Sequence, residues 1–246
     1  MSGLFALLSY WTPVLAAGFA MNIWISINAM AIGTVLGVLT GLGRATGPRW
    51  MQTALNGVTH FCRNTPSIVL LFYLAYLLPF EVTVFGISVP LPGWAKAIFG
   101  LSIPVLGFIS DNVLGAVRGI DRDQWDAAAA LGYGRWSLLT KVILPQTVPM
   151  LMPPWMSYFA IIVMASSTAS MVGVKEIIAS ATVVMDTTTD PALIIPVYLY
   201  VLCWFFAFCY PFSHLTKWME RRRWRQTGKH DRRRHVRPPE WRGQAL

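Results

Sequence analysis

Charged residues are scarce in this sequence. Only 13% of the 246 residues are Asp, Glu, Lys or Arg, whereas 55% are hydrophobic. A soluble domain of this size carries roughly a quarter charged residues, so most of the surface of this chain must meet an apolar medium. The composition predicts one membrane-embedded domain and excludes a separate globular part.

Patterns that bind metals, disulfides or phosphates are also lacking. The three cysteines, Cys62, Cys203 and Cys209, stand in apolar stretches without CxxC spacing, and the 4 histidines show no ligand spacing. We expect small buried cysteines, no metal site and no cofactor. No Gly-x-x-x-x-Gly-Lys-Ser/Thr loop occurs, so ATP hydrolysis by this chain is not expected and we do not predict an enzyme.

Long charge-free stretches are abundant. A helix needs about 20 mainly apolar residues to cross the hydrocarbon, and only helices satisfy their own backbone there. The predicted fold is therefore all-α, a polytopic membrane protein with about five transmembrane helices. The predicted spans cover residues 15–42, 65–78 (extended backward through His60 and Arg63), 94–114, the charge-free run between Lys141 and Lys175, and 191–215.

Two details of the first span can be predicted. Residues 1–43 carry no charge and are too long for one crossing, so we expect a short interfacial helix ahead of the span. Gly33, Gly37 and Gly41 repeat at a spacing of four. This spacing allows close helix packing, although the sequence equally permits glycines that are merely tolerated.

The basic residues are concentrated at the C-terminus. From Lys217 onward there are eleven Lys or Arg against three acids, whereas the other 216 residues hold nine basic and eight acidic residues. This pattern favours a cytoplasmic anchor beside anionic lipid over a nucleic-acid-binding arm. We divide the chain into a transmembrane domain, residues 1–220, and a basic cytoplasmic tail, residues 221–246.

The charge distribution also predicts the orientation. Five spans place the termini on opposite sides, with the N-terminus outside if the basic tail is cytoplasmic. The outer connections then hold only Lys96 and Lys175 as basic residues, beside acids that include Glu176. The inner connections hold Arg44, Arg49, Arg118, Arg122, Arg135 and Lys141. This asymmetry follows the positive-inside rule.

The longest inner connection, residues 123–146, predicts two short helices. The first is alanine-rich, with acids in its first turn where they favour the helix dipole, and Gly132 ends it. The second stops at Leu144-Pro145. A smooth alanine surface at the membrane face makes a plausible dock for another protein.

This connection resembles the EAA loop of bacterial ABC importer permeases. That loop has Glu-Ala-Ala, then Gly after three residues and Ile-x-Leu-Pro after nine. Here Asp126-Ala127-Ala128 is followed at the same spacing by Gly132 and by Val142-x-Leu144-Pro145. The resemblance implies that these residues form an ATPase-coupling loop: Asp126, Ala127, Ala128, Gly132, Val142, Leu144 and Pro145.

Other segments resemble the polar amino-acid (histidine, glutamine or arginine) branch of that family. Arg63-Asn64-Thr65-Pro66 stands where the branch has Arg-Gly-Thr-Pro, Asp111 where it has an acid late in span three, and Gly173-Val174-Lys175-Glu176 where it has Gly-Val-x-Glu. The chain departs from the branch at Leu114 (for Arg), at Ser157 (for Asn) and at 164–167, which reads Met-Ala-Ser-Ser for Lys-Asp-Thr-Ser. These departures remove charge from the pathway and leave the solute open.

Candidate pathway or gating residues are Arg63, Asn64, Thr65, Asp111, Ser166 and Ser167. Charges near the membrane usually face a pathway or partner, but Arg63 and Asp111 could equally lie in the headgroup layer. The hydroxyls at 166–170 could line a polar path. The sequence slightly favours the alternative that they bond back to helix carbonyls.

The resemblance implies a permease subunit of an ABC importer in the bacterial cytoplasmic (inner) membrane. It would move a polar amino acid or related small solute inward. The implied partners are a cytoplasmic ABC ATPase dimer, a second permease (the same or a sister chain) and a periplasmic or extracellular solute-binding protein. Membrane lipid surrounds the subunit, and no nucleic acid is involved. The alternative is an ion-gradient transporter or channel, which usually relies on intramembrane carboxylates and internal repeats.

Overall fold

The computed structural model describes residues 2–79, 81–84, 87–188 and 190–234. In chain order its elements are α1 (Ser2–Thr46), α2 (Arg49–Asn64), α3 (Ser67–Leu77), β1 (Glu81–Val84), β2 (Ile87–Pro90), α4 (Gly93–Arg118), α5 (Arg122–Ala130), α6 (Arg135–Leu138), the π-helical turn η1 (Leu139–Ile143), α7 (Leu144–Ala165), the 3₁₀ helix η2 (Ser166–Val172), α8 (Ile177–Thr188), the 3₁₀ turn η3 (Pro191–Leu193) and α9 (Ile194–Arg234).

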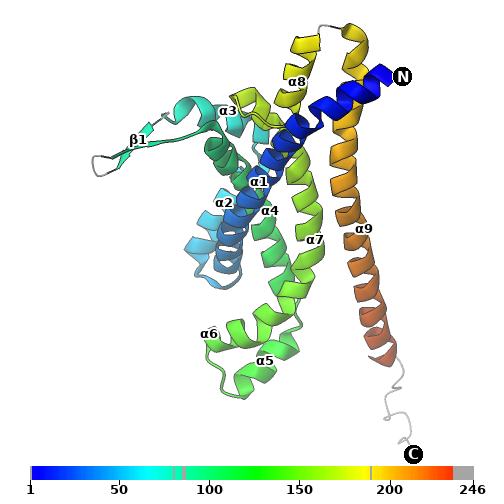
Figure 1. Cartoon of the computed structure of the whole chain (residues 1–246). Coiled ribbons are helices and arrows are strands. Elements are labelled where there is room, and N and C mark those ends of the chain that lie inside the picture. The colour runs from blue at the N-terminus through cyan, green and yellow to red at the C-terminus, as the bar shows by residue number, and fades with distance from the viewer. Residues whose placement is uncertain (1, 80, 85–86, 189, 235–246) are drawn as a thin grey trace, which may run out of the picture.

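The helices form an elongated bundle. Among the described residues, four segments are long and apolar enough to cross a membrane: Leu7–Thr46, Gly93–Arg118, Arg135–Val172 and Pro191–Arg221. In Figure 1, α1, α4 and α9 run one way and α2–α3 and α7 the other, and the termini lie at opposite ends. The predicted all-α polytopic fold is confirmed.

The predicted second span is wrong as a single helix. Its residues form α2 and α3, both shorter than a membrane span, with a break between Asn64 and Ser67. Pro66 explains the break, because proline lacks an N–H and disfavours helical geometry in the residue before it. Thr65 accordingly has an extended backbone, φ −80° and ψ 127°.

The N-terminal residues do not form the separate short helix that was expected. The described chain is helical from Ser2 to Thr46 without interruption, and Pro13 lies inside this one helix. A proline inside a helix can kink it without ending it. In Figure 1, α1 bends in its N-terminal part.

A β-hairpin that the sequence did not predict connects α3 to α4. β1 pairs antiparallel with β2, with Glu81 opposite Pro90 and Val84 opposite Ile87. Both strands are rich in Val, Ile and Thr, which favour extended structure. The hairpin projects away from the helices (Figure 1), at the same end of the molecule as the N-terminus.

The glycine stripe of α1 packs directly on α4. A Cβ added to Gly33 would lie 2.4 Å from the Cβ of Val105, one on Gly37 2.6 Å from that of Ile109, and one on Gly41 2.7 Å from that of Val113. Real Cβ atoms do not approach so closely, so these positions require glycine. Of the two possibilities that the sequence left open, close packing is the one observed.

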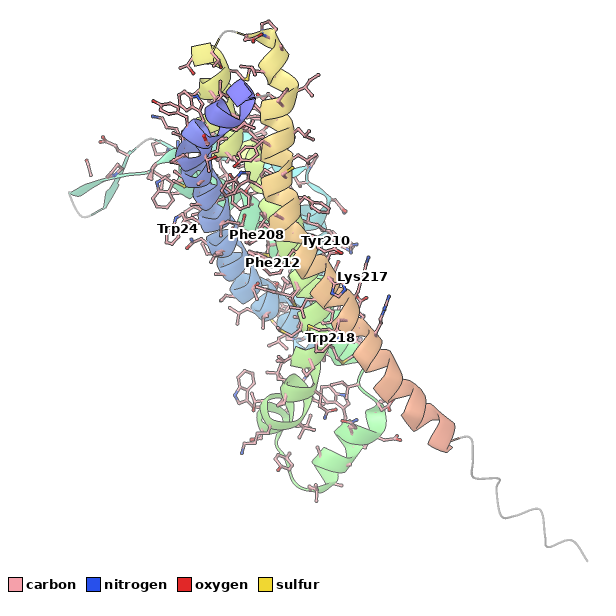
Figure 2. All side chains as sticks on the ribbon, turned by 45° about the vertical axis from the view of Figure 1, so that its right-hand side comes forward. Trp24, Phe208, Tyr210, Phe212, Lys217 and Trp218 are labelled. Carbon is pink, nitrogen blue, oxygen red and sulfur yellow. The ribbon has the colours of Figure 1, made fainter. Side chains whose placement is uncertain are left out.

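Aromatic rings pack α9 against the bundle. Phe212 lies 5.3 Å from Phe159 of α7, and Phe208 lies 5.7 Å from Phe19 of α1, measured between ring centroids. Figure 2 labels Phe208 and Phe212 on α9, with Lys217 and Trp218 further along the same helix. The expected boundary between 220 and 221 falls inside α9, which continues to Arg234. Residues 235–246 of the expected tail lie outside the described residues.

The cysteines differ from the expectation at one position. Cys62 is buried and Cys209 half-buried, but Cys203 is exposed. Cys203 lies on α9, much of whose apolar surface faces outward because the helix packs along one side of the bundle. Within the described residues, no group of three or more His, Cys, Asp or Glu side chains could hold a metal ion.

Candidate functional site

The predicted coupling loop folds as a helical hairpin at the end of the bundle opposite the N-terminus (Figure 1). Its first helix, α5, ends where Gly132 adopts φ +79°. The Gly132 amide donates to Ala129 O at 2.9 Å, and the Tyr133 amide donates to Ala128 O at 3.2 Å. This pair of bonds is a Schellman motif. Gly132 thus ends the helix as the sequence predicted.

Three of the four alanines of α5 are exposed: Ala127, Ala129 and Ala130. Asp126 and Ala127 are exposed, whereas Ala128 is only 5% exposed and belongs to the core. Larger residues of the loop add to this exposed apolar surface, since Leu131 is 78% and Trp136 is 76% exposed. Sequence analysis did not single out these two residues, although a tryptophan in a polar inner connection was a visible signal.

The second helix of the loop does not stop at Leu144-Pro145 as predicted. α6, η1 and α7 form one continuous helical run, and the Leu144 amide donates to Leu139 O across the π turn. Pro145 has no N–H and its ring would clash with the carbonyl four residues earlier. The wide π turn accommodates it, so the helix is remodelled without ending. Val142 and Leu144 are half-buried and Pro145 is exposed.

One side chain ties this loop to the first span. Arg135, at the start of α6, donates from Nη2 to the carbonyl oxygen of Thr46, the last residue of α1. A cation at a helix C-terminus is favourable because the helix dipole is negative there. The loop is therefore held by α1 as well as by the helices that precede and follow it.

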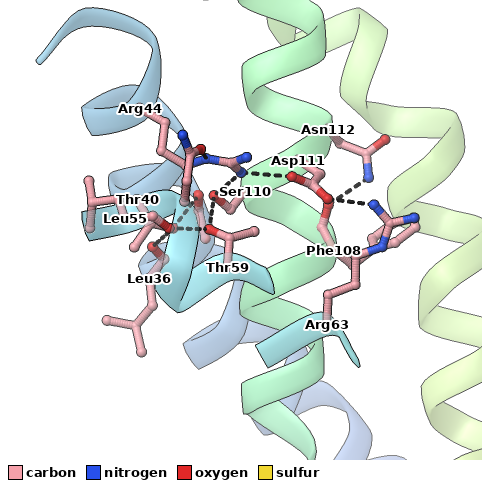
Figure 3. A network of polar contacts seen from close by, with 12 residues as sticks. Leu36, Thr40, Arg44, Leu55, Thr59, Arg63, Phe108, Ser110, Asp111 and Asn112 are labelled. Carbon is pink, nitrogen blue, oxygen red and sulfur yellow. Dashed lines mark hydrogen bonds and ion pairs between the residues drawn. The ribbon is translucent and has the colours of Figure 1, made fainter. Parts of the chain in front are cut away.

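An ion cluster joins α1, α2 and α4 (Figure 3). Asp111 Oδ1 accepts from Arg44 Nη1 at 2.7 Å, and Asp111 Oδ2 accepts from Arg63 Nη1 at 2.6 Å. Arg44 also donates to Asn56 Oδ1 at 2.7 Å and to Ser110 Oγ at 3.0 Å. Its side chain is 5% exposed, whereas that of Arg63 is 59% exposed. Sequence analysis placed Arg44 in a connection and missed this buried role.

Glycine positions explain why these charges meet. Gly41 lets α1 approach α4 one turn before Arg44. On the other side, a Cβ at Gly107 would lie 2.9 Å from the backbone nitrogen of Arg63. Gly107 precedes Asp111 by one helical turn, so this contact brings the end of α2 beside the carboxylate. Two close approaches thus set the geometry of the cluster.

A cavity of about 400 Å³ opens beside the cluster. Its wall contains Arg63, Phe108, Asp111, Asn112, Gly115, Ala116, Met150 and Leu151. The ring of Phe108 stacks on Tyr158 of α7 at a centroid distance of 3.9 Å and an interplanar angle of 6°. This stack joins α4 to α7 beside the cavity. Arg63 and Asp111 form the charged end of the cavity, and Phe108, Met150 and Leu151 form its apolar wall.

The remaining candidate pathway residues lie elsewhere. Asn64 and Thr65 form the end of α2, where the Thr65 hydroxyl donates to Phe61 O at 2.7 Å. Ser166 is fully buried; it donates to Val163 O at 2.7 Å and accepts from Asn22 Nδ2 at 3.0 Å. Ser167 donates to Met164 O at 2.8 Å. Of the six candidates, only Arg63 and Asp111 meet.

Two charges that were expected in outer connections are buried. Glu176 is 0% exposed; it accepts from Asn22 Nδ2 at 3.0 Å and from the Ala179 amide at 2.8 Å, at the start of α8. Lys96 is 2% exposed, and its Nζ donates to Ala75 O at 3.0 Å and Leu78 O at 2.8 Å at the end of α3. Both side chains cap helix ends, a role that a span assignment does not reveal.

Comparison with known proteins identifies the family. Residues 33–225 match the family described as "Binding-protein-dependent transport system inner membrane component". The chain belongs to this family. The match covers α2 to α8, the ion cluster and the coupling loop.

Curated relatives are consistent with this membership. The chain is 26% identical over 200 residues to the L-cystine transport system permease protein TcyB of Bacillus subtilis, covering 81% of this chain and 82% of that protein. It is 28% identical over 166 residues to the glutamine transport system permease protein GlnP of Escherichia coli K12, covering 67% and 74%. It is also 26% identical over 172 residues to YckA of B. subtilis, a probable amino-acid ABC transporter permease, covering 70% and 74%.

Solved structures share the fold. A crystal structure of an amino acid ABC transporter with histidines superposes with a TM-score of 0.75 at 21% identity, covering 89% of this chain and 98% of that chain. A MetNI methionine ABC transporter structure gives a TM-score of 0.64 at 18% identity, covering 85% and 97%. The predicted ABC permease family is confirmed. The relatives of this chain are transport permeases. The comparisons therefore favour the importer permease over the alternative of an ion-gradient transporter or channel.

Proposed function

We propose that this chain is a permease subunit through which an amino acid or a closely related small solute enters the cytoplasm. A separate ATPase drives the transport by docking on residues 123–146. Family membership supports the transport role, and the three relatives named above are described as permeases for amino acids, cystine or glutamine.

The observation that carries the docking proposal is the exposed apolar surface of the coupling loop. Leu131 and Trp136 each leave more than three quarters of their surface exposed at a turn held by Gly132. Tryptophan is among the residues most enriched in binding hot spots, and Leu131 contributes further exposed apolar surface on the same loop. Asp126 is exposed on α5 of the same loop, and we expect it to pair with a basic residue of the ATPase.

The orientation follows from the position of this loop. An ATPase is cytoplasmic, so the end of the bundle with the loop and the basic C-terminal segment faces the cytoplasm. The N-terminus and the β1–β2 hairpin then face outward, toward a solute-binding protein. A second permease, either another copy or a sister chain, completes the pathway. Alkaline phosphatase fused at the C-terminus is expected to be inactive and at the N-terminus active; the reverse pattern would overturn the orientation.

Docking is tested by co-purification. The chain carries an affinity tag and is co-expressed with the ATPase encoded nearest to its gene, and the ATPase recovered with it is quantified. Trp136→Ala and Leu131→Asp are expected to reduce recovery at least tenfold. Trp50→Ala is the matched control, because Trp50 is 74% exposed and stands four residues after Thr46, the α1 residue that Arg135 contacts.

The outcomes separate clearly. If wild type and Trp50→Ala retain the ATPase and the loop variants lose it, the docking proposal is supported. If wild type never retains an ATPase, or all variants retain it equally, the proposal is wrong. Ala128 is a poor test position, because it is buried and a charge there would disturb the loop itself.

The solute is tested in cells that express the complete system. Uptake of each of the twenty protein amino acids in labelled form is compared with uptake by a strain without the permease. Dependence on the permease for at least one amino acid supports the proposed solute class. Equal uptake of all twenty with and without the permease would exclude it.

A further inference from the structure

We infer that the cavity beside Asp111 binds the α-carboxylate and α-ammonium groups of a zwitterionic amino acid, with Arg63 as the carboxylate ligand and Asp111 as the ammonium ligand. The inference rests on the proposed function, and it adds a recognition site inside the permease itself. It is carried by the different environments of the two arginines.

Arg44 alone suffices to hold Asp111 in place. It is buried, approaches Oδ1 at 2.7 Å, and makes further hydrogen bonds to Asn56 and Ser110. Arg63 is more than half exposed and, in the described part of the chain, its guanidinium makes one ion pair, with Oδ2 at 2.6 Å. A guanidinium has five N–H donors in a fork that matches a carboxylate. Arg63 therefore has N–H donors that can bind a ligand, whereas Arg44 is buried and donates to Asp111, Asn56 and Ser110.

The local charges indicate which ligand fits. Among the described residues of this cluster, one carboxylate serves two guanidiniums, so a second carboxylate from a ligand would give Arg63 its own partner. Asp111 Oδ2 would then accept the ligand ammonium while Oδ1 keeps Arg44. The result is an alternating series of Arg44, Asp111, ammonium, carboxylate and Arg63. Each charge in this series has a neighbour of opposite sign, and because the zwitterion is neutral the cluster keeps its net charge of +1.

The cavity has a suitable size and lining for such a ligand. Its volume of about 400 Å³ lies within the roughly 300–1,000 Å³ of small-molecule sites, which usually combine apolar walls with a few polar groups. Phe108, Met150 and Leu151 line the apolar part, and Asn112 lies next to Asp111. The charged end would recognise the groups that all amino acids share, and the rest would contact the side chain.

The position in the fold places this site on the cytoplasmic side in the proposed orientation. Asp111 lies in the last two turns of α4, and Met150 and Leu151 lie near the start of α7, so both helices reach the cavity close to the coupling loop. A solute would meet this site after it passes the outer half of the bundle. A site beside the loop is well placed to respond to ATPase closure.

The test measures binding to the purified permease–ATPase complex in lipid nanodiscs without the solute-binding protein, which would otherwise dominate recognition. Each of the twenty labelled protein amino acids is a probe, and for any that binds, its α-carboxamide is the competitor. We expect saturable binding, with the carboxamide at least tenfold weaker than the acid. In Arg63→Gln the acid is expected to bind at least tenfold weaker than in wild type and no better than its carboxamide. Arg49→Gln, an exposed arginine on the same helix, is the matched control and is expected to bind like wild type.

Retention of the ATPase and the thermal unfolding midpoint report whether Arg63→Gln is folded. Arg63→Lys is a second variant that keeps the charge but loses the fork, and it is expected to lie between wild type and Arg63→Gln. Equal binding by wild type and Arg63→Gln, equal binding of acid and carboxamide, or no binding to wild type would each overturn the inference. The uptake assay in cells does not depend on these results, so amino-acid uptake without binding here would reject this site and keep the proposed function.

Discussion

Gly107 of α4 and Arg63 of α2 meet backbone to backbone. A Cβ on Gly107 would stand 2.9 Å from the Arg63 nitrogen and 3.2 Å from its Cα. Backbone atoms cannot move aside as a flexible side chain can, so this contact requires glycine. It also fixes the distance from Arg63 to Asp111, one turn further along α4.

Gly107→Ala is therefore expected to push α2 away from α4 and to lengthen the ion pair between Arg63 and Asp111. Overpacking of this kind costs about 1–3 kcal/mol, measured as a lower unfolding midpoint of the detergent-purified complex. Gly57→Ala is the control, since a Cβ there would meet nothing within 4 Å in the described part of the chain. Within a helix, that substitution should stabilise by up to about 1 kcal/mol. An equal effect of both variants would contradict the role assigned to Gly107.

The Arg44–Asp111 and Arg63–Asp111 ion pairs are expected to contribute unequally to the free energy of unfolding. Asp111→Asn leaves Arg44 buried without an anion, and breaking a buried pair costs about 3 kcal/mol or more. Arg63→Gln removes an exposed pair, which is worth about 1 kcal/mol or less. Thermal unfolding of both variants measures the difference. Comparable losses would show that Arg63 is as structural as Arg44 and would weaken its assignment as a ligand.

Asn22 is expected to contribute strongly to stability, because it joins α1 to η2 and to the start of α8. Its amide nitrogen donates to Ser166 Oγ and Glu176 Oε2, each at 3.0 Å, and its Oδ1 accepts from the Ile177 amide at 3.1 Å. Asn22→Ala removes these bonds inside the protein, where each unsatisfied group costs about 1–3 kcal/mol. We expect strong destabilisation in thermal unfolding. Asn28→Ala, on the same helix, removes only a bond to Trp24 O and should be nearly neutral; a similar loss there would point to a general effect on α1.

Pro145 is expected to control the register between the coupling loop and α7. Pro145→Ala restores a backbone donor and lets the π turn close into regular α-helix, which turns α6 relative to α7 by about one residue, or ~100°. Transport and ATP hydrolysis are then measured together in proteoliposomes. We expect more ATP hydrolysed per solute moved, with little change in the unfolding midpoint. An unchanged ratio would show that the π turn has no part in coupling.

The features that the sequence predicted correctly rest on local patterns. The loop motif placed Gly132 at the end of α5, whereas the spacing of the α1 glycines allowed a helix contact without deciding for it. Charge-free length gave the spans α4, α7 and α9. The break at Pro66 was predictable from the same rules that govern proline, but apolar length was weighed more heavily than the residue before proline.

The site depends on contacts between distant segments, which the sequence does not contain. Arg44 and Arg63 were visible as charges near span ends, but their sharing of Asp111 follows from how three helices cross. Glu176 and Lys96 looked like solvent-facing residues because outer connections are usually wet. Each instead is buried and hydrogen-bonds to free backbone groups at the end of a helix. The hairpin gives little signal in the sequence, because each of its strands has only 4 residues.

The glycine stripe of α1 has a mechanical consequence. With no side chain between the two backbones at Gly33, Gly37 and Gly41, α1 and α4 have no room to slide or rotate against each other and behave as one stiff rod. A push applied at the coupling loop reaches this rod twice, through α4 directly and through Arg135 at the tip of α1. In the proposed orientation, displacement at the cytoplasmic face is expected to reach the other end of α1 through this rod, and flexing is expected where α7 and α9 pack through larger side chains.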